Sequence, residues 1–140
     1  MKEIVTYLTF QGTCGAAMKF YARCLGGELF MMPFTDMPGG PPPGVPPAGK
    51  DMVMHASLTI GTCKIMASDA MPGAPFHQGN NFSVALSPES IEETEKLFAA
   101  LGENGTVTMA LQDTFWGAYF GMITDQFGIN WMFNFEKPKP

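Results

Sequence analysis

The chain has 140 residues and a formal net charge of −5, and 46% of its residues are apolar while 15% are charged. This length fits one domain of ordinary size, and such an apolar composition excludes a disordered chain. An acidic chain without a Lys/Arg cluster argues against nucleic acid and against an anionic membrane surface as partners. No apolar run approaches the ~20 residues of a membrane helix, and the N-terminus lacks the apolar stretch of a signal peptide. We therefore expect a cytoplasmic protein, in which Cys14, Cys24 and Cys63 are free thiols.

The first half of the chain predicts one strand, one helix and three further strands, at 4–10, 14–25, 28–34, 52–60 and 63–69. Thr13 stands at the N-cap position of the helix, and Gly26-Gly27 ends it. Gly61-Thr62 forms the tight turn between the last two strands. The segment 38–49 contains ten Pro or Gly among its twelve residues, which predicts a long loop. This loop covers a cavity or an interface, or else it is a surface loop without function.

The second half predicts the same order of elements, with strands at 81–86, 105–112, 118–125 and 129–135. Its helix is expected to start after an N-cap at Ser87, with Pro88 at the first helical position, and to run through 90–101. Because the two halves repeat with an offset of about 76 residues, we expect two βαβββ modules in a single α+β domain. The bounds are about 1–69 and 80–140, with a linker at 70–79.

Three segments carry a family resemblance: GTCGAAMKFYARCLGGEL at 12–29, MHASLTIG at 54–61 and DTFWGAYFGMITDQFGINWMFN at 113–134. They resemble the glyoxalase/bleomycin-resistance (vicinal oxygen chelate) superfamily, and within it the PhnB-like branch. The resemblance implies that each module curls its strands into half a barrel, with the helix outside and a ligand cavity inside. It also implies a homodimer. Members of this branch often carry a demethylubiquinone methyltransferase label, but the chain lacks the Gly-rich turn of a parallel α/β sheet that commonly holds a methyl donor.

Metal-dependent relatives hold a divalent ion with four inward side chains, usually His and Glu, from the first and last strand of each module. Carried over by strand register, these positions fall near Val5 or Tyr7, Met66 or Ser68, Asn81 or Phe82, and Met132. None of these residues is His, Glu or Asp, so the resemblance implies that this metal centre is absent. We expect neither a metal nor a cofactor.

His55 is the candidate catalytic residue. His55, Ser57 and Thr59 share one face of a predicted strand, opposite Met54, Ala56, Leu58 and Ile60. If the apolar face meets the helix, His55 points into the cavity, where a neutral imidazole can bind a substrate oxygen or act as a base. The plainer alternative is a hydrogen-bonded histidine at an interface or at the barrel rim. His77 is expected in a solvated loop, and Asp69 in a turn.

The motif DTFWGAYFG predicts one aromatic wall of a mostly apolar pocket. Trp116 and Tyr119 are favoured for ligand contact, and Phe115 and Phe120 for the core. Along the last strand, Ile129, Trp131, Phe133 and Phe135 should pack on the helix, while Asn130, Met132 and Asn134 face the cavity. The predicted ligand-binding residues are therefore Tyr7, His55, Met66, Asp113, Trp116, Tyr119, Met132 and Asn134.

The leading hypothesis is a metal-independent, dimeric small-molecule binding protein. The alternative is a divalent-metal-dependent lyase, isomerase or dioxygenase that uses His55 with Asp69 or Glu28 as unusual ligands. A scaffolding dimer with the segment 38–49 as partner surface is a third possibility.

Overall fold

The computed structural model describes residues 1–36, 38–40, 43 and 51–138. The chain divides into two compact units, Met1–Gln78 and Gly79–Pro140, and each is described by itself. Most of the predicted Pro-rich loop at 38–49 lies outside the described residues. The division between the units falls inside the predicted linker at 70–79.

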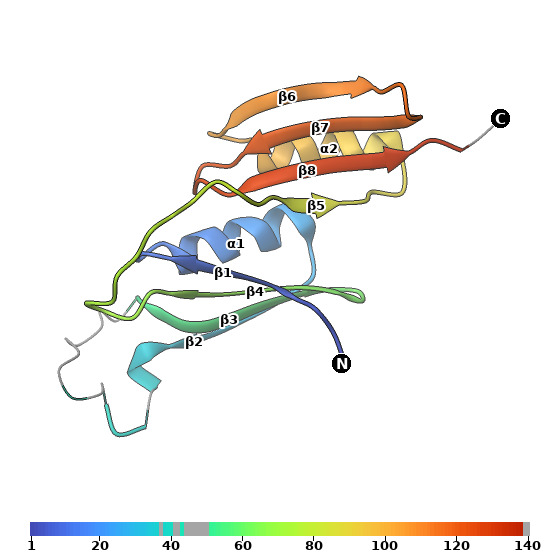
Figure 1. Cartoon of the computed structure of the whole chain (residues 1–140). Helices are drawn as coiled ribbons and strands as arrows, with labels where there is room; N and C mark the ends of the chain where they lie inside the picture. Colours follow the sequence, from blue (N-terminus) through green and yellow to red (C-terminus); the bar gives the residue numbers. More distant parts are fainter. Residues whose placement is uncertain (37, 41–42, 44–50, 139–140) are drawn as a thin grey trace. The chain divides into compact units, whose positions relative to one another are not determined.

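Each unit contains one helix and one four-stranded sheet (Figure 1). Unit 1 consists of β1 (Thr6–Phe10), α1 (Cys14–Leu25), β2 (Glu28–Pro33), the short 3-10 helix η1 (Phe34–Asp36), β3 (Val53–Ile60) and β4 (Cys63–Asp69). Unit 2 consists of β5 (Val84–Leu86), α2 (Ile91–Leu101), β6 (Thr106–Asp113), β7 (Ala118–Thr124) and β8 (Asn130–Glu136).

The two sheets have the same topology. Their strand orders are β1-β4-β3-β2 and β5-β8-β7-β6, and in each sheet the first strand pairs parallel with the last while the other pairs are antiparallel. The predicted α+β class and the repeated βαβββ order are thus confirmed. The clearest difference in bounds is at β5, which begins at Val84 rather than at 81, because the Asn130 side-chain amide donates to the backbone carbonyls of Asn80 and Phe82 just before it.

One face of each sheet packs on the helix of its own unit (Figure 1). In unit 1 the alternation of β3 places Ala56 and Leu58 on this face, and both are fully buried. In unit 2 the buried residues of β8 are Trp131 and Phe133, and the Phe133 ring meets Phe98 of α2 edge to face at 5.3 Å. The prediction that the bulkier side of strand 129–135 packs on the helix is confirmed, and the condition stated for strand 52–60, that its apolar side meets the helix, is met.

The two helices are capped differently, and only α1 has its N-cap at the predicted residue. Helix α2 has its N-cap at Ser90 rather than Ser87: the Ser90 hydroxyl accepts from the Glu93 amide, and the Glu93 carboxylate accepts from the Glu89 amide. Thr13 stands at the N-cap of α1, but its side chain makes no capping hydrogen bond. The Asp69 carboxylate, at the end of β4, instead accepts from the amides of Gly12 and Cys14.

Candidate functional site

Within each unit the helix packs on one face of the sheet, and the other face carries the side chains that point away from the helix. We call these second faces the open faces. Residues paired across neighbouring strands point to the same face, so strand register assigns their members. The open face of unit 1 comprises Tyr7, Thr9, Glu28, Phe30, Met32, His55, Ser57, Thr59, Lys64, Met66 and Ser68. The open face of unit 2 comprises Ala85, Met109, Gln112, Phe120, Met122, Met132 and Asn134.

Tyr7 and His55 form a hydrogen-bonded pair on the open face of unit 1. The Tyr7 Oη and the His55 Nδ1 are 3.2 Å apart, and the two rings stack with centroids 5.8 Å apart at an interplanar angle of 29°. Tyr7 comes from β1 and His55 from β3, so the pair reaches across β4, which carries Met66 opposite Tyr7. The structure therefore brings together three of the predicted ligand-binding residues, Tyr7, His55 and Met66.

A row of three methionines crosses the open face of unit 2. Met109 of β6 pairs with Met122 of β7, which pairs with Met132 of β8. The adjacent row holds Gln112, Phe120 and Asn134, so the row supplies one aromatic ring between two amides. Of these residues, sequence reasoning had selected only Met132 and Asn134. Met109 was missed because two register shifts in β6 break its alternation. Met122 was also not selected, although the regular alternation of β7 could have placed it on the same face as Met132.

The turn between β6 and β7 presents two aromatic side chains. The Thr114 hydroxyl closes this turn with hydrogen bonds to the amide and carbonyl of Ala118. Trp116 is 56% exposed, and its ring lies 5.9 Å from that of Phe120, which places Trp116 beside the open face. The prediction that Phe115 lies in the core is wrong, because at this tip its side chain is 97% exposed.

Asp113 and Tyr119 lie apart from the other predicted site residues of unit 2. They pair with each other across β6 and β7, and Tyr119 also pairs with Phe135, so both stand on the side of the sheet opposite Phe120 and Asn134. Asp113 forms an ion pair with Lys137. The structure therefore does not bring Asp113 and Tyr119 together with Met132, Asn134 and Trp116.

Asp69 is also turned away from His55. It is 2% exposed on the helix side of its sheet, and besides capping α1 it accepts from the Val53 amide at 2.8 Å. Its carboxylate is thus committed to backbone amides, and the suggested pairing of His55 with Asp69 as metal ligands is contradicted. Burial, together with the nearby Asp69 charge, raises the pKa of the Cys14 thiol to about 12, so this thiol is protonated at neutral pH.

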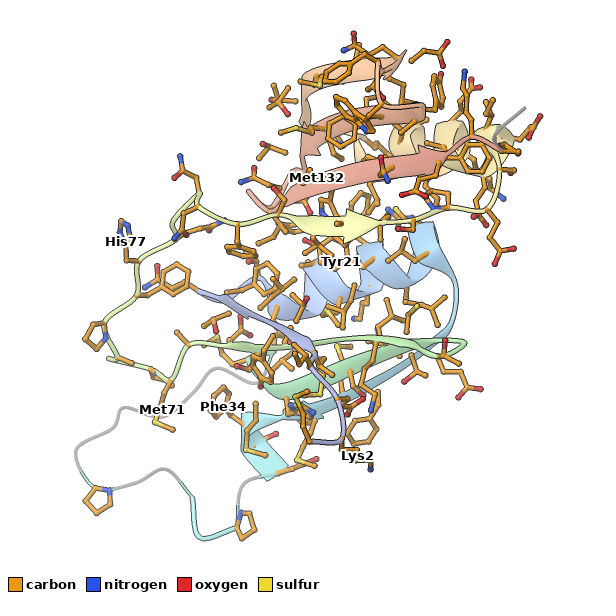
Figure 2. All side chains as sticks on the ribbon, turned by 45° about the vertical axis from the view of Figure 1, so that its right-hand side comes forward. Lys2, Tyr21, Phe34, Met71, His77 and Met132 are labelled. Atoms are coloured by element: carbon orange, nitrogen blue, oxygen red, sulfur yellow. The ribbon has the colours of Figure 1, made fainter. Side chains whose placement is uncertain are left out.

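The donor atoms on the open faces do not fit a divalent metal centre built from several histidine and glutamate side chains. Near Tyr7 and Met66 they are a phenol, a thioether, serine hydroxyls and the single imidazole of His55, whereas Zn, Ni, Fe and Mn prefer several imidazoles and carboxylates. Within residues 1–36, 38–40, 43 and 51–138, no three His, Cys, Asp or Glu side chains are grouped to hold a metal. His77 is exposed, and Figure 2 shows its ring on the connecting segment, pointing away from the strands.

The chain resembles proteins of known sequence and structure along nearly its whole length. Protein YjdN of Escherichia coli (strain K12) is 38% identical over 142 residues, which cover 96% of this chain and 95% of that protein. The crystal structure of protein PA1353 from Pseudomonas aeruginosa is 44% identical, with a TM-score of 0.87 over 99% of this chain and 100% of that one. A Bacillus cereus structure described as a putative 3-demethylubiquinone-9 3-methyltransferase, PhnB protein, shares the fold at 23% identity and a TM-score of 0.75, covering 96% and 99% of the two chains.

None of the described helices is both long and apolar enough to cross a membrane. Residues 4–133 match the family model described as the Glyoxalase/Bleomycin resistance protein/Dioxygenase superfamily. Since this match spans most of the sequence and agrees with the paired βαβββ topology, the chain belongs to the glyoxalase/bleomycin resistance/dioxygenase superfamily.

Proposed function

We propose that the protein binds small, mainly apolar or aromatic molecules on the open faces of its sheets, without a divalent metal. The observation that carries this proposal is the methionine row of unit 2 with its aromatic neighbours. Met109 is 40% exposed and Trp116 is 56% exposed. Neighbouring large apolar side chains that stay exposed together often mark a binding surface.

The side chains of this surface suit a variable ligand. Methionine is flexible and polarisable, so a row of three can adapt to ligands of different shape. Phe120 and Trp116 offer flat faces for stacking. Gln112 and Asn134 add two amides at one end, which gives the common design of a small-molecule site, a mostly apolar lining with few polar groups.

The binding test uses the uncharged fluorescent aromatic probe N-phenyl-1-naphthylamine. We expect saturable binding, weakened about tenfold, equivalent to ~1.4 kcal/mol, by Trp116→Ala or Met122→Ser. Val107→Ser is the matched control, because Val107 is an equally accessible apolar residue of β6, 52% exposed, that pairs with Ile123 on the helix side. Equal affinity in all three variants and the parent would contradict the proposal.

Tryptophan fluorescence adds a local readout. The chain has two tryptophans, and Trp131 is fully buried while Trp116 is exposed. A ligand on the open face of unit 2 should therefore quench Trp116 and leave Trp131 unchanged. In Trp116→Phe the ligand-dependent quenching should disappear; quenching that persists in this variant would mean that the ligand binds elsewhere.

Metal independence is tested by elemental analysis of protein produced with Mn, Fe, Ni and Zn supplied. We expect no stoichiometric metal after dialysis. A retained metal that is lost in His55→Ala, with the fold intact, would favour the metal-dependent lyase, isomerase or dioxygenase instead. We also propose a homodimer, which sedimentation equilibrium would show as twice the chain mass.

A further inference from the structure

We propose that the open face of unit 1 recognises an acidic group, a carboxylate or a comparable oxyanion, through Tyr7 and His55. The inference rests on the proposed function, because the apolar part of the ligand is taken to bind on the open face of unit 1 next to this pair. It adds the chemical class of the ligand: an aromatic or aliphatic acid rather than a neutral apolar compound.

The first argument is the geometry of the pair. The hydrogen bond of 3.2 Å and the stacked rings fix the phenol and the imidazole relative to each other across β4. Tyr7 is 46% exposed and His55 is half-buried, so both polar groups remain within reach of a ligand. A pre-organised pair loses little conformational entropy when it binds, which favours recognition over a purely packing role.

The second argument is the supply of hydrogen-bond donors. The neutral pair has two possible arrangements. In one, the Tyr7 hydroxyl donates to His55 Nδ1, and the His55 Nε2–H is the donor left for a ligand. In the other, the His55 Nδ1–H donates to the Tyr7 oxygen, and the Tyr7 hydroxyl is the donor left for a ligand. Once His55 is protonated, Nδ1–H donates to the Tyr7 oxygen, and both the Nε2–H and the Tyr7 hydroxyl can donate outward. Two donors beside one positive charge match the two oxygens of a carboxylate.

The third argument is the charge around the pair. On the open face, β1 contributes Tyr7, β2 contributes Glu28, β3 contributes His55 and β4 contributes Lys64 as titratable groups. Glu28 pairs with Thr59, which lies four residues along β3 from His55. The Lys64 Nζ lies 4.0 Å from the Glu3 Oε1, so this ammonium group is paired with a carboxylate. Among the described residues, no carboxylate forms an ion pair with His55. A bound acid would therefore supply the negative charge that an imidazolium favours.

The fourth argument is the surrounding surface. Met66 and Ser57 continue the row that starts at Tyr7, and Phe30, 54% exposed, ends it on β2. Ser68 stands beside this row on β4, opposite Thr9. The site thus offers hydroxyls next to the Tyr7–His55 pair and an apolar stretch leading away from it, which suits an acid with an apolar body.

The experiment uses benzoate as the probe, benzamide as its neutral control and the intact chain. The chain has two histidines, and both give C2–H proton resonances in one NMR spectrum. The His55 resonance reports on the proposed site, and that of the exposed His77 serves as an internal reference. We expect benzoate to shift the His55 resonance saturably, to leave His77 unchanged, and to bind at least tenfold more tightly than benzamide. Equal shifts of both histidines, or equal binding of benzamide, would overturn the inference.

The pH dependence sharpens the test. Only a protonated imidazole adds a positive charge to the site, whereas benzoate is ionised throughout the neutral range, so affinity should fall as the pH is raised. Tyr7→Phe keeps the ring and removes the hydroxyl, and it should weaken benzoate binding about tenfold. His55→Gln keeps a donor that cannot be protonated, and it should abolish the pH dependence; a pH dependence that persists in this variant would overturn the inference.

The two proposals can fail separately. The uncharged probe N-phenyl-1-naphthylamine with Trp116→Ala tests the open face of unit 2, and benzoate with Tyr7→Phe tests that of unit 1. If Trp116→Ala leaves probe binding unchanged while benzoate still shifts His55, the proposed apolar surface of unit 2 is wrong and the acidic-group site stands.

Discussion

The two units are built alike on their helix sides and differently on their open faces. On the helix side, each unit contains one buried aspartate that accepts from the protein itself: Asp69 from the amides of Gly12, Cys14 and Val53, and Asp125 from the amides of Phe127 and Ile129 and from the Trp131 indole. On the open face, unit 1 has a Tyr–His pair with serines, and unit 2 has methionines with aromatic rings.

This difference shows that the fold depends on one side of each sheet and leaves the other free to vary. The helix-side residues are constrained by close packing and by the need to satisfy buried amides. The open-face residues are subject to neither constraint, so their side chains can differ between the two units according to the ligand that each face binds. The following predictions test this division, from the largest expected effect to the smallest.

Burial on the helix side should have its largest effect on cysteine reactivity. Burial and the Asp69 charge raise the pKa of Cys14 from 9.0 to about 12, while Cys63, paired with Ile60 at the start of β4, is exposed. Since only the thiolate reacts, the raised pKa lowers the reactive fraction of Cys14 about a thousandfold near neutral pH, so Cys14 should react with iodoacetamide far more slowly than the exposed Cys63 and faster only as the pH approaches its raised pKa. Mass spectrometry of timed samples measures both rates; comparable rates would mean that Cys14 is accessible.

Removing either buried aspartate should destabilise the fold severely. Asp69→Ala and Asp125→Ala each leave buried N–H groups without an acceptor, so each should lower the free energy of unfolding by about 3–5 kcal/mol. Urea denaturation measures this effect. Asp113→Ala is the control, because the Asp113 side chain is 68% exposed and its ion pair with Lys137 should contribute less than about 1 kcal/mol.

Gly121 should tolerate no side chain on the helix side of unit 2. A Cβ at this position would lie 2.8 Å from the Leu111 Cδ2 and 3.0 Å from the Phe98 Cε2, so Gly121→Ala should cost about 1–3 kcal/mol through overpacking. Gly79→Ala is the control, since its Cβ would approach the Asn81 side chain to only 3.6 Å. Thermal unfolding compares the two; an unchanged Gly121→Ala would show that Leu111 can move aside freely.

The helix caps should give the smallest effect and separate the two units once more. Ser90→Ala removes the hydroxyl that accepts from the Glu93 amide, and it should cost about 1 kcal/mol. Thr13→Ala should change stability far less, because the Thr13 side chain caps nothing and Asp69 accepts from the Cys14 amide instead. Equal losses in the two variants, measured by urea denaturation, would contradict the assignment of Asp69 as the cap of α1.

Alternation and turn residues were sufficient to predict the elements of the fold. The helix at 14–25 and the strand at 63–69 have the predicted bounds, and the two sides of strand 129–135 were assigned correctly. The N-cap of α2 was misplaced because Ser87-Pro88 was taken as the helix start. The sequence carried a signal for Ser90, since Glu93 stands three residues after it at the spacing of a capping box, whereas Ser87 has no Glu or Gln at that spacing.

The candidate site was less predictable because it depends on pairing between distant strands. Tyr7 and His55 are 48 residues apart in sequence and meet only through the parallel pairing of β1 with β4. Tyr119 was placed with Trp116, although in unit 2 the register turns it to the helix side with Asp113. A strand pattern gives two faces, but it does not say where a turn ends and the alternation begins.

The connection between β2 and β3 has a practical consequence for engineering. The Phe34 amide donates to the Met52 carbonyl at 3.1 Å, and the next residue, Val53, is held by Asp69. Phe34 and Val53 are therefore anchored at the two ends of this connection, whereas unit 2 spans the equivalent connection with the four residues 114–117. Since the entropy of closing a loop rises only slowly with its length, lengthening the connection between these anchors with a reporter peptide should cost little stability.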